Sequence, residues 1–186
     1  MRQDYSSLPD DLPRPHDDGA SDHLKGMRLP PVRLPATTGA SIDLATLPPG
    51  RSAIFVYPMT GRPGAALPEG WDAIPGARGC TPQNCAIRDV HREFVELGVS
   101  VYALSTQSPD EQAEMAARLH LPYPVLSDET CEFAEALRLP MFEAAGVRRI
   151  RRLTLIVRDG VIEHVFYPVF PPDRSAEAAL EWLRRN

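Results

Sequence analysis

The stretch AIFVYP at residues 53–58 is a compact apolar run that ends at a proline. A short run of this kind is typical of a buried β-strand. After it, residues 61–79 are rich in glycine and proline and have no periodicity, which indicates a long loop. Before it, residues 28–34 and 41–44 flank Thr37-Thr38-Gly39, which predicts a short hairpin. The first part of the domain is therefore expected to hold a hairpin, one buried strand and a long loop.

A helix is expected directly after this loop. Thr81 is a good N-cap, and Pro82 has the backbone geometry that is favoured at the first helical position. Gly98 ends the helical pattern. The apolar run that follows, residues 99–105, predicts a second strand. We therefore expect a helix at residues 81–97 between two strands.

The rest of the chain continues the alternation of strands and helices. Ser108 and Glu111 have the spacing of a capping box and predict a helix to about Leu119. The later elements expected, in order, are a strand at residues 124–126, a helix after Ser127 and Asp128, a hairpin of residues 152–157 and 161–167 around Asp159 and Gly160, and a final helix capped by Asp173 or Ser175. This order predicts an α/β, thioredoxin-like fold: a central mixed sheet flanked by helices, with an amino-terminal hairpin and an extended arm.

Length, charge and apolar content narrow the class of protein. The chain has 186 residues, 43% of them hydrophobic, which is enough for one domain with its own core. Residues 1–27 are polar and broken by prolines, so an extended or partly disordered arm is expected there, and the domain at residues 28–186. The net charge of −5 argues against nucleic acid or a membrane as a partner. We expect a cytoplasmic protein, because no secretory signal or membrane-spanning stretch is present.

Two of the three cysteines lie close together at the expected helix start. Cys80 precedes the helix, where free N–H groups and the helix dipole favour a thiolate. Cys85 lies five residues further on, so an intact helix separates the two Cα atoms by roughly 8 Å. A disulfide needs about 4.4–6.8 Å. The pair can bond only if the first turn unwinds, which indicates a redox switch rather than a structural bridge.

Two other interpretations of Cys80 and Cys85 stay open on these residues alone. Both can be packed thiols, since free cysteine often behaves as a small core residue. Metal binding is disfavoured, because zinc sites usually space their cysteines by two residues and no second pair or spaced histidines complete four ligands. The Cys-x-x-Cys signature of thiol–disulfide oxidoreductases is also absent.

Residues 79–89, GCTPQNCAIRD, closely resemble the active-site helix start of the peroxiredoxins. They are most similar to the Q-type, bacterioferritin-comigratory-protein-like group of the alkyl hydroperoxide reductase/thiol-specific antioxidant superfamily. Further matches follow in order at residues 55–58, 104–105, 124–128, 152–155 and 159–160. The resemblance implies an enzyme: a thiol-dependent peroxidase for hydrogen peroxide and organic hydroperoxides, with no metal, haem or flavin cofactor.

The resemblance also implies roles for individual residues. Cys80 would be the peroxidatic cysteine, which peroxide oxidises to a sulfenic acid. Cys85 would be the resolving cysteine, and thioredoxin or a similar dithiol protein would reduce the intramolecular disulfide between the two. Arg152 matches the family arginine that holds the thiolate and the peroxide. Its alternative is a solvated basic run, since other arginines surround it, but its strand position beside Thr154 favours the functional role.

The lead-in to the first cysteine departs from the family pattern. The family has proline seven residues and threonine or serine three residues before that cysteine, where this chain has Ala73 and Ala77. Residues 57–64 resemble the usual lead-in instead, which indicates an insertion at about residues 62–78. We therefore hypothesise that Thr60 supplies the active-site hydroxyl.

Three residues are expected to bind the substrate: Pro58, Gly79 and, within the insertion, Trp71. Trp71 and Ile74 would form an apolar wall for organic peroxides; the alternative, of equal weight, is that they only pin the loop. Cys131 is a second candidate for the resolving role, although a packed or spectator thiol is favoured.

The expected partners are the peroxide substrate and a dithiol reductant. The expected assembly is a monomer or a weak dimer. No long cysteine-bearing tail follows the last helix, which argues against the intermolecular disulfide of the typical two-cysteine peroxiredoxins. The alternative function is a non-peroxidatic redoxin that acts as a peroxide sensor or a disulfide-exchange partner. A third interpretation is a protein that keeps the fold but has no redox activity, with Cys80 buried and unreactive.

Overall fold

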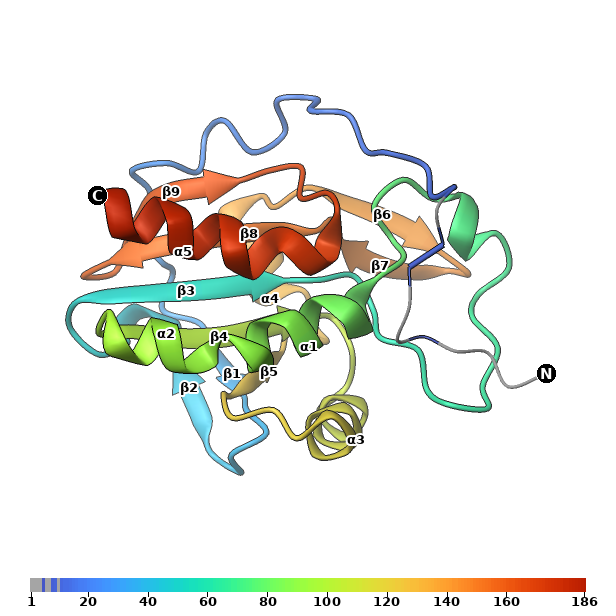
Figure 1. Cartoon of the computed structure of the whole chain (residues 1–186), viewed down its shortest axis with the longest axis horizontal. Coiled ribbons are helices and arrows are strands. Elements are labelled where there is room, and N and C mark those ends of the chain that lie inside the picture. The colour runs from blue at the N-terminus through green and yellow to red at the C-terminus, as the bar shows by residue number, and fades with distance from the viewer. Residues whose placement is uncertain (1–4, 6–7, 10) are drawn as a thin grey trace.

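A five-stranded mixed sheet forms the centre of the molecule (Figure 1). The computed structural model describes residue 5, residues 8–9 and residues 11–186. The strand order is β5-β4-β3-β8-β9; β3, β4 and β5 run parallel to one another, and β8 runs antiparallel to both of its neighbours. The bounds are β3 Arg51–Val56, β4 Val99–Ser105, β5 Val125–Ser127, β8 Leu153–Arg158 and β9 Val161–Phe166. The predicted central mixed sheet is confirmed.

Helices and two small hairpins surround this sheet. The α-helices are α1 Cys80–Asp89, α2 His91–Glu96, α3 Pro109–Leu119, α4 Glu132–Leu137 and α5 Ser175–Arg185. Short 3-10 helices lie at Leu44–Thr46, Trp71–Ala73 and Pro172–Arg174. The hairpins are β1 Arg33–Pro35 with β2 Ser41–Asp43, as the sequence predicts, and β6 Met141–Ala144 with β7 Val147–Ile150.

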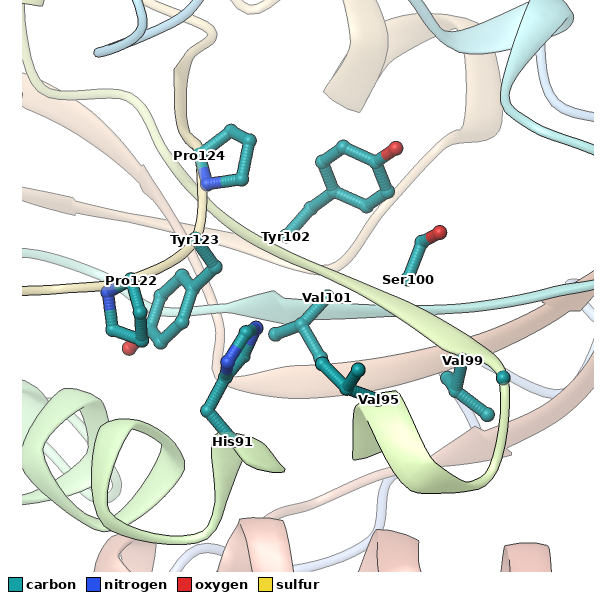
Figure 2. A pocket seen from close by; sticks show the side chains of 10 residues that line it. His91, Val95, Val99, Ser100, Val101, Tyr102, Pro122, Tyr123 and Pro124 are labelled. Carbon is teal, nitrogen blue, oxygen red and sulfur yellow. The ribbon is translucent and has the colours of Figure 1, made fainter. Parts of the chain in front are cut away.

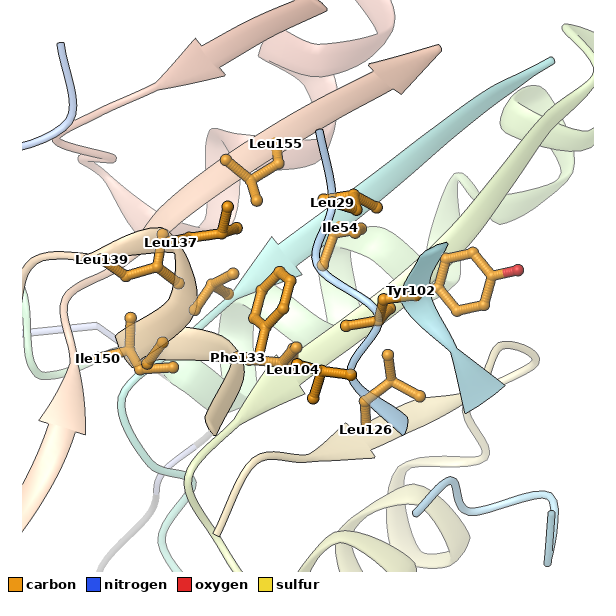
Figure 3. Packing of buried hydrophobic residues seen from close by; sticks show 14 of the residues in the cluster. Leu29, Ile54, Tyr102, Leu104, Leu126, Phe133, Leu137, Leu139, Ile150 and Leu155 are labelled. Carbon is orange, nitrogen blue, oxygen red and sulfur yellow. The ribbon is translucent and has the colours of Figure 1, made fainter. Parts of the chain in front are cut away.

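The sheet has an apolar core on each face, because successive residues of β3 point to opposite sides. Ala53 and Phe55 belong to the core that α1, α2, α3 and α5 cover. Ile54 belongs to the other core, where Phe133 of α4 and residues of β1 pack against it (Figure 3). This second core also includes Leu104 and Leu155 from the neighbouring strands. The apolar run that predicted a buried strand is therefore the middle strand of the sheet.

The helix expected at residues 81–97 begins one residue earlier and is broken. Its N-cap is Gly79 rather than Thr81, and Gly79 has a left-handed backbone with φ of +100°. Val90 leaves the helical conformation, with φ −109° and ψ 11°, and separates α1 from α2. The capping-box prediction at Ser108 is confirmed, since Ser108 and Glu111 cap each other's backbone N–H.

Two other local predictions differ from the structure. The hairpin β6–β7 was not predicted, because residues 141–150 have neither a clear alternation nor a two-residue turn signal. The N-cap of α5 is Arg174, and neither Asp173 nor Ser175 caps it with a side chain. Asp173 lies instead in a single 3-10 turn that precedes the helix.

The amino-terminal segment packs against two parts of the domain. Leu24 is fully buried in the core on the α4 face. Beside it, the Gly26 N–H donates to the carbonyl of Ile162 in β9 at 2.8 Å. Further towards the start, the Tyr5 hydroxyl donates to the Ala65 carbonyl at 2.6 Å. The segment thus passes from the β9 edge to the loop before α1 (Figure 1).

Candidate active site

The amino-terminal end of α1 lies in a confined space that only glycine can enter. A Cβ atom on Gly79 would lie 2.4 Å from Pro172 Cγ and 2.7 Å from Leu8 Cδ2, and the positive φ is unfavourable for any other residue. Gly79 thus allows the loop before α1 to turn directly into the helix. The next residue, Cys80, begins the helix with its side chain 2% exposed.

The Cys80 sulfur lies among polar groups as well as core side chains. Its thiol donates to the Ala77 carbonyl at 3.5 Å, and Arg152 Nη2 donates to Sγ at 3.2 Å. The guanidinium and the N-terminus of α1 both direct positive charge at the sulfur. A buried thiol beside a fixed cation can act as a nucleophile.

Arg152 connects the sulfur to the loop that precedes it. The guanidinium is 3% exposed, and its Nη2 also donates to the carbonyls of Gly76, Ala77 and Arg78 at 3.0–3.2 Å. Its Nη1 donates to Gln83 Oε1. The Arg152 side chain is therefore buried, with its guanidinium pointing into the protein. The arginines of a solvated basic run would point into water instead.

Several polar atoms around Cys80 are buried without a hydrogen-bond partner among the described residues. They are Thr81 Oγ1, Gln83 Nε2, Arg152 Nε and Thr154 Oγ1. An unpaired buried polar group is costly unless a ligand or solvent satisfies it. Arg152 contacts the sulfur and Gln83 contacts Arg152, so the unpaired Arg152 Nε and Gln83 Nε2 are candidates to bind the oxygens of a small polar ligand there. Sequence reasoning missed Gln83, whose only signal was its place one turn after Cys80.

Thr60 lies on a different part of the lead-in. Its hydroxyl donates to Gln107 Oε1 at 3.1 Å, and Gln107 Nε2 donates back to the Thr60 carbonyl at 3.3 Å. Thr60, Gln107 and Glu111 line a surface pocket of about 390 Å³ whose lining does not include the reactive cysteine. The assignment of the active-site hydroxyl to Thr60 stays a prediction. Pro58 is buried directly after β3.

Trp71 packs inside the loop between β3 and α1. Its ring is 2% exposed, tilts against Phe142 of β6 with ring centroids 5.9 Å apart, and belongs to a small apolar cluster with Ala77 and Ala144. Ile74 packs against the same cluster. These contacts hold Ala77 in place three residues before the cysteine, and direct contact of Trp71 with substrate stays a prediction.

All three cysteines are unpaired in this structure. Cys85 is half-buried on α1, where burial raises the pKa of its thiol and the nearby Arg88 opposes that shift. Cys131 is buried at the N-cap of α4, with φ of +61°, and burial together with Asp128 raises the pKa of its thiol. The helix is continuous from Cys80 to Cys85, so the two sulfurs meet only after local unwinding.

No group of three or more metal-ligating side chains is found within the described part of the chain. Across the same residues, no helix combines the length and apolar character that a membrane span needs. A surface pocket of about 440 Å³ lies beside α2 and β4, and none of the cysteines lines it (Figure 2).

The fold and the buried cysteine define the class of protein. The sequence model of the family described as Redoxin matches residues 24–180, and the chain belongs to this family. Peroxiredoxin Bcp of Escherichia coli (strain K12) is 27% identical over 161 residues, which cover 84% of this chain and 93% of that protein. The chloroplastic peroxiredoxin Q of Sedum lineare is 26% identical over 160 residues, covering 86% and 77%.

Solved structures agree with this assignment. Peroxidoxin BcpB from Mycobacterium tuberculosis has a TM-score of 0.69 and 28% identity, covering 88% of this chain and 98% of that one. Peroxiredoxin Q of Xanthomonas campestris, at 18% identity and a TM-score of 0.65, supports the fold, with coverage of 95% and 96%. The predicted thioredoxin-like fold is confirmed, and the chain is a Q-type peroxiredoxin, an oxidoreductase with thiol peroxidase activity.

Proposed function

We propose that the chain reduces hydrogen peroxide and organic hydroperoxides through Cys80, with Cys85 as the resolving cysteine and thioredoxin or a similar dithiol protein as the reductant. The observation that carries this proposal is the contact of 3.2 Å between Arg152 Nη2 and Cys80 Sγ at the start of α1. It combines a nucleophile, a fixed cation and a helix N-terminus in one buried site.

In the first step, the Cys80 thiolate attacks one oxygen of the peroxide and the O–O bond breaks. The sulfur becomes a sulfenic acid, and the second oxygen leaves as water or an alcohol. Negative charge develops on that leaving oxygen, so donors already aimed at the site stabilise the transition state. Arg152 and the unpaired groups of Thr81 and Gln83 are the candidates for this role.

In the second step, the Cys85 thiol attacks the sulfenic sulfur. A Cys80–Cys85 disulfide forms and water leaves. The continuous helix between the two residues must open for this step, since their Cα atoms are too far apart along an intact helix. The dithiol reductant then restores both thiols by disulfide exchange.

The second candidate function is a peroxide sensor or disulfide-exchange partner with the same switch. The observation that favours it is Ala77, which stands where the family pattern has a hydroxyl, while the Thr60 hydroxyl is directed to Gln107. Such a protein would form the disulfide but turn over slowly with peroxide. The rate of catalytic turnover therefore separates the two functions.

The test is consumption of NADPH in the presence of thioredoxin, its reductase and either hydrogen peroxide or an organic hydroperoxide. We expect turnover in the wild type and in Cys131→Ser, none in Cys80→Ser, and a strong loss in Cys85→Ser. Full turnover by Cys80→Ser would refute the mechanism. Turnover by Cys85→Ser but not by Cys131→Ser would transfer the resolving role to Cys131.

A further inference from the structure

We propose that Tyr123 and Asn84 form a latch that holds the start of α1 wound, and so set how fast a Cys80 sulfenic acid is converted to the disulfide. The inference rests on the proposed function, because it concerns the second of its two steps. It assigns positioning roles to two residues outside the reacting atoms. The latch determines whether the Cys80 sulfenic acid is resolved to the disulfide or is oxidised further.

The latch acts on the segment between the two cysteines. The Tyr123 hydroxyl donates to the Asn84 backbone carbonyl at 2.9 Å and lies 3.2 Å from Asn84 Oδ1. Asn84 Nδ2 in turn donates to the Cys80 carbonyl at 2.9 Å. These contacts add a side-chain connection to the ordinary helix hydrogen bonds over residues 80–84. They fasten the peptide that immediately precedes Cys85.

Both residues are buried, so water does not compete for these contacts. Asn84 is fully buried and Tyr123 is 4% exposed. Burial raises the pKa of Tyr123, so its hydroxyl remains a donor. Hydrogen bonds that lose a partner in such surroundings leave an unsatisfied polar group, which is more costly than the bond itself.

Tyr123 is a rigid anchor for the latch. It lies between Pro122 and Pro124, and the Pro124 carbonyl accepts from the Ala103 N–H of β4 at 3.1 Å. Its ring packs beside that of His91, with centroids 5.7 Å apart, on the wall of the 440 Å³ pocket (Figure 2). The anchor is therefore attached to β4 through the next residue and is not part of the helix that must open.

The other end of α1 has its own attachment. Arg88 Nη1 donates to the Leu119 carbonyl at the end of α3 at 2.9 Å. This bond does not involve residues 80–85, so the second half of the helix can stay in place while the first half unwinds. The Tyr123–Asn84 contacts are thus positioned to control the opening of the first turns alone.

Two reactions compete for the sulfenic acid. In resolution, Cys80–SOH and the Cys85 thiol give the disulfide and water. In further oxidation, Cys80–SOH and a second hydroperoxide give a sulfinic acid and an alcohol or water. Only the first needs the helix to open. A tighter latch therefore favours the sulfinic acid at high peroxide, and a weaker latch favours the disulfide.

The test is Tyr123→Phe, which removes the hydroxyl and keeps the ring. Rapid quenching and mass spectrometry of the Cys80 peptide follow sulfenic acid, disulfide and sulfinic acid at graded peroxide. We expect disulfide formation to accelerate about three- to tenfold, as loss of one buried hydrogen bond predicts. The sulfinic fraction should fall by a similar factor, and the rate of sulfenic acid formation should stay within twofold of the wild type.

Tyr102→Phe is the matched control. Tyr102 lies in β4 and lines the same pocket, and among the described residues no hydrogen bond joins it to α1, so Tyr102→Phe should leave all three rates unchanged. Hydrogen exchange supplies a second readout: the amides of residues 84–87 should exchange faster in Tyr123→Phe, and those of α5 should not. Unchanged resolution in Tyr123→Phe, or equal acceleration in Tyr102→Phe, would overturn the latch. A wild type that forms no Cys80–Cys85 disulfide would instead refute the proposed function.

Discussion

Arg152 contacts both the Cys80 sulfur and the loop that precedes α1. Its Nη2 reaches the Cys80 sulfur and the carbonyls of three consecutive loop residues. The two N–H groups of Nη2 are shared among these acceptors, while Nη1 of the same planar guanidinium donates to Gln83 Oε1. Sequence reasoning found the residue but not its second role, since the loop carbonyls carry no signal in the side-chain pattern.

Arg152→Lys is expected to lower the rate of sulfenic acid formation about 10²–10³-fold, because the charge remains but the fixed donors toward the separating oxygens are lost. Stopped-flow measurement of peroxide consumption in the first turnover checks this. Arg151→Lys is the control, since Arg151 is less buried and stacks over Phe142 instead. A rate for Arg152→Lys within threefold of the wild type would contradict the assigned role.

At the scale of elements, caps and turns that depend on neighbouring residues could be predicted from the sequence. Features that depend on contacts between distant residues could not. The Ser108–Glu111 capping box and the turn at Asp159-Gly160 act within a few residues, and both are found as predicted. The N-cap at Gly79 depends on Pro172 and Leu8, which lie far away in the sequence. The β6–β7 hairpin likewise packs through Phe142 against Trp71, which lies about 70 residues earlier in the sequence. Such contacts leave no local pattern to read.

Arg51 in β3 and Glu163 in β9 form an ion pair across β8, and its contribution to the stability of the fold depends on pH. Arg51 Nε and Nη2 donate to the two carboxylate oxygens at 2.9 and 3.0 Å, and these bonds lower the pKa of Glu163 below its ordinary value of 4.5. Because the pKa of Glu163 is lower in the folded state than in the unfolded state, its carboxylate stabilises the fold at pH values above the unfolded-state pKa. This contribution is lost as the pH falls through the folded-state pKa.

Urea unfolding of wild type and Glu163→Gln checks this prediction. The wild type should be the more stable at pH 7, and the difference in unfolding free energy should shrink as the pH falls from about 5 to about 3. The effect is modest, since the pair is partly exposed. A difference that grows on acidification would show that the carboxylate destabilises the fold.

At the scale of the whole molecule, the amino-terminal segment and the loop between β3 and α1 form one region around the start of α1. Leu8 approaches Gly79, Pro15 approaches Gly76, and Tyr5 bonds to Ala65. The excess of proline before Cys80 marked both segments as irregular, but their mutual packing could not be predicted from composition. Leu24 is as buried as any core residue, so the amino-terminal segment packs into the domain core at this residue.

Leu24→Ala is expected to lower the free energy of unfolding by about 2–5 kcal/mol, as for a leucine removed from a well-packed core. Guanidinium unfolding measures the change. Val147→Ala, at a side chain 44% exposed, should change the stability by no more than about 0.5 kcal/mol. A loss below about 1 kcal/mol for Leu24→Ala would mean that the segment is a detachable arm rather than part of the fold.

In the proposed mechanism, Cys80 is the nucleophile and Cys85 is its intramolecular partner. One equivalent of hydrogen peroxide added to the fully reduced protein, followed by alkylation, proteolysis and mass spectrometry without reductant, tests it directly. We expect a single disulfide-linked peptide pair that contains Cys80 and Cys85, with Cys131 alkylated and no sulfinic acid. A linkage through Cys131, or Cys80 recovered as an alkylated thiol after the peroxide has been consumed, would contradict it.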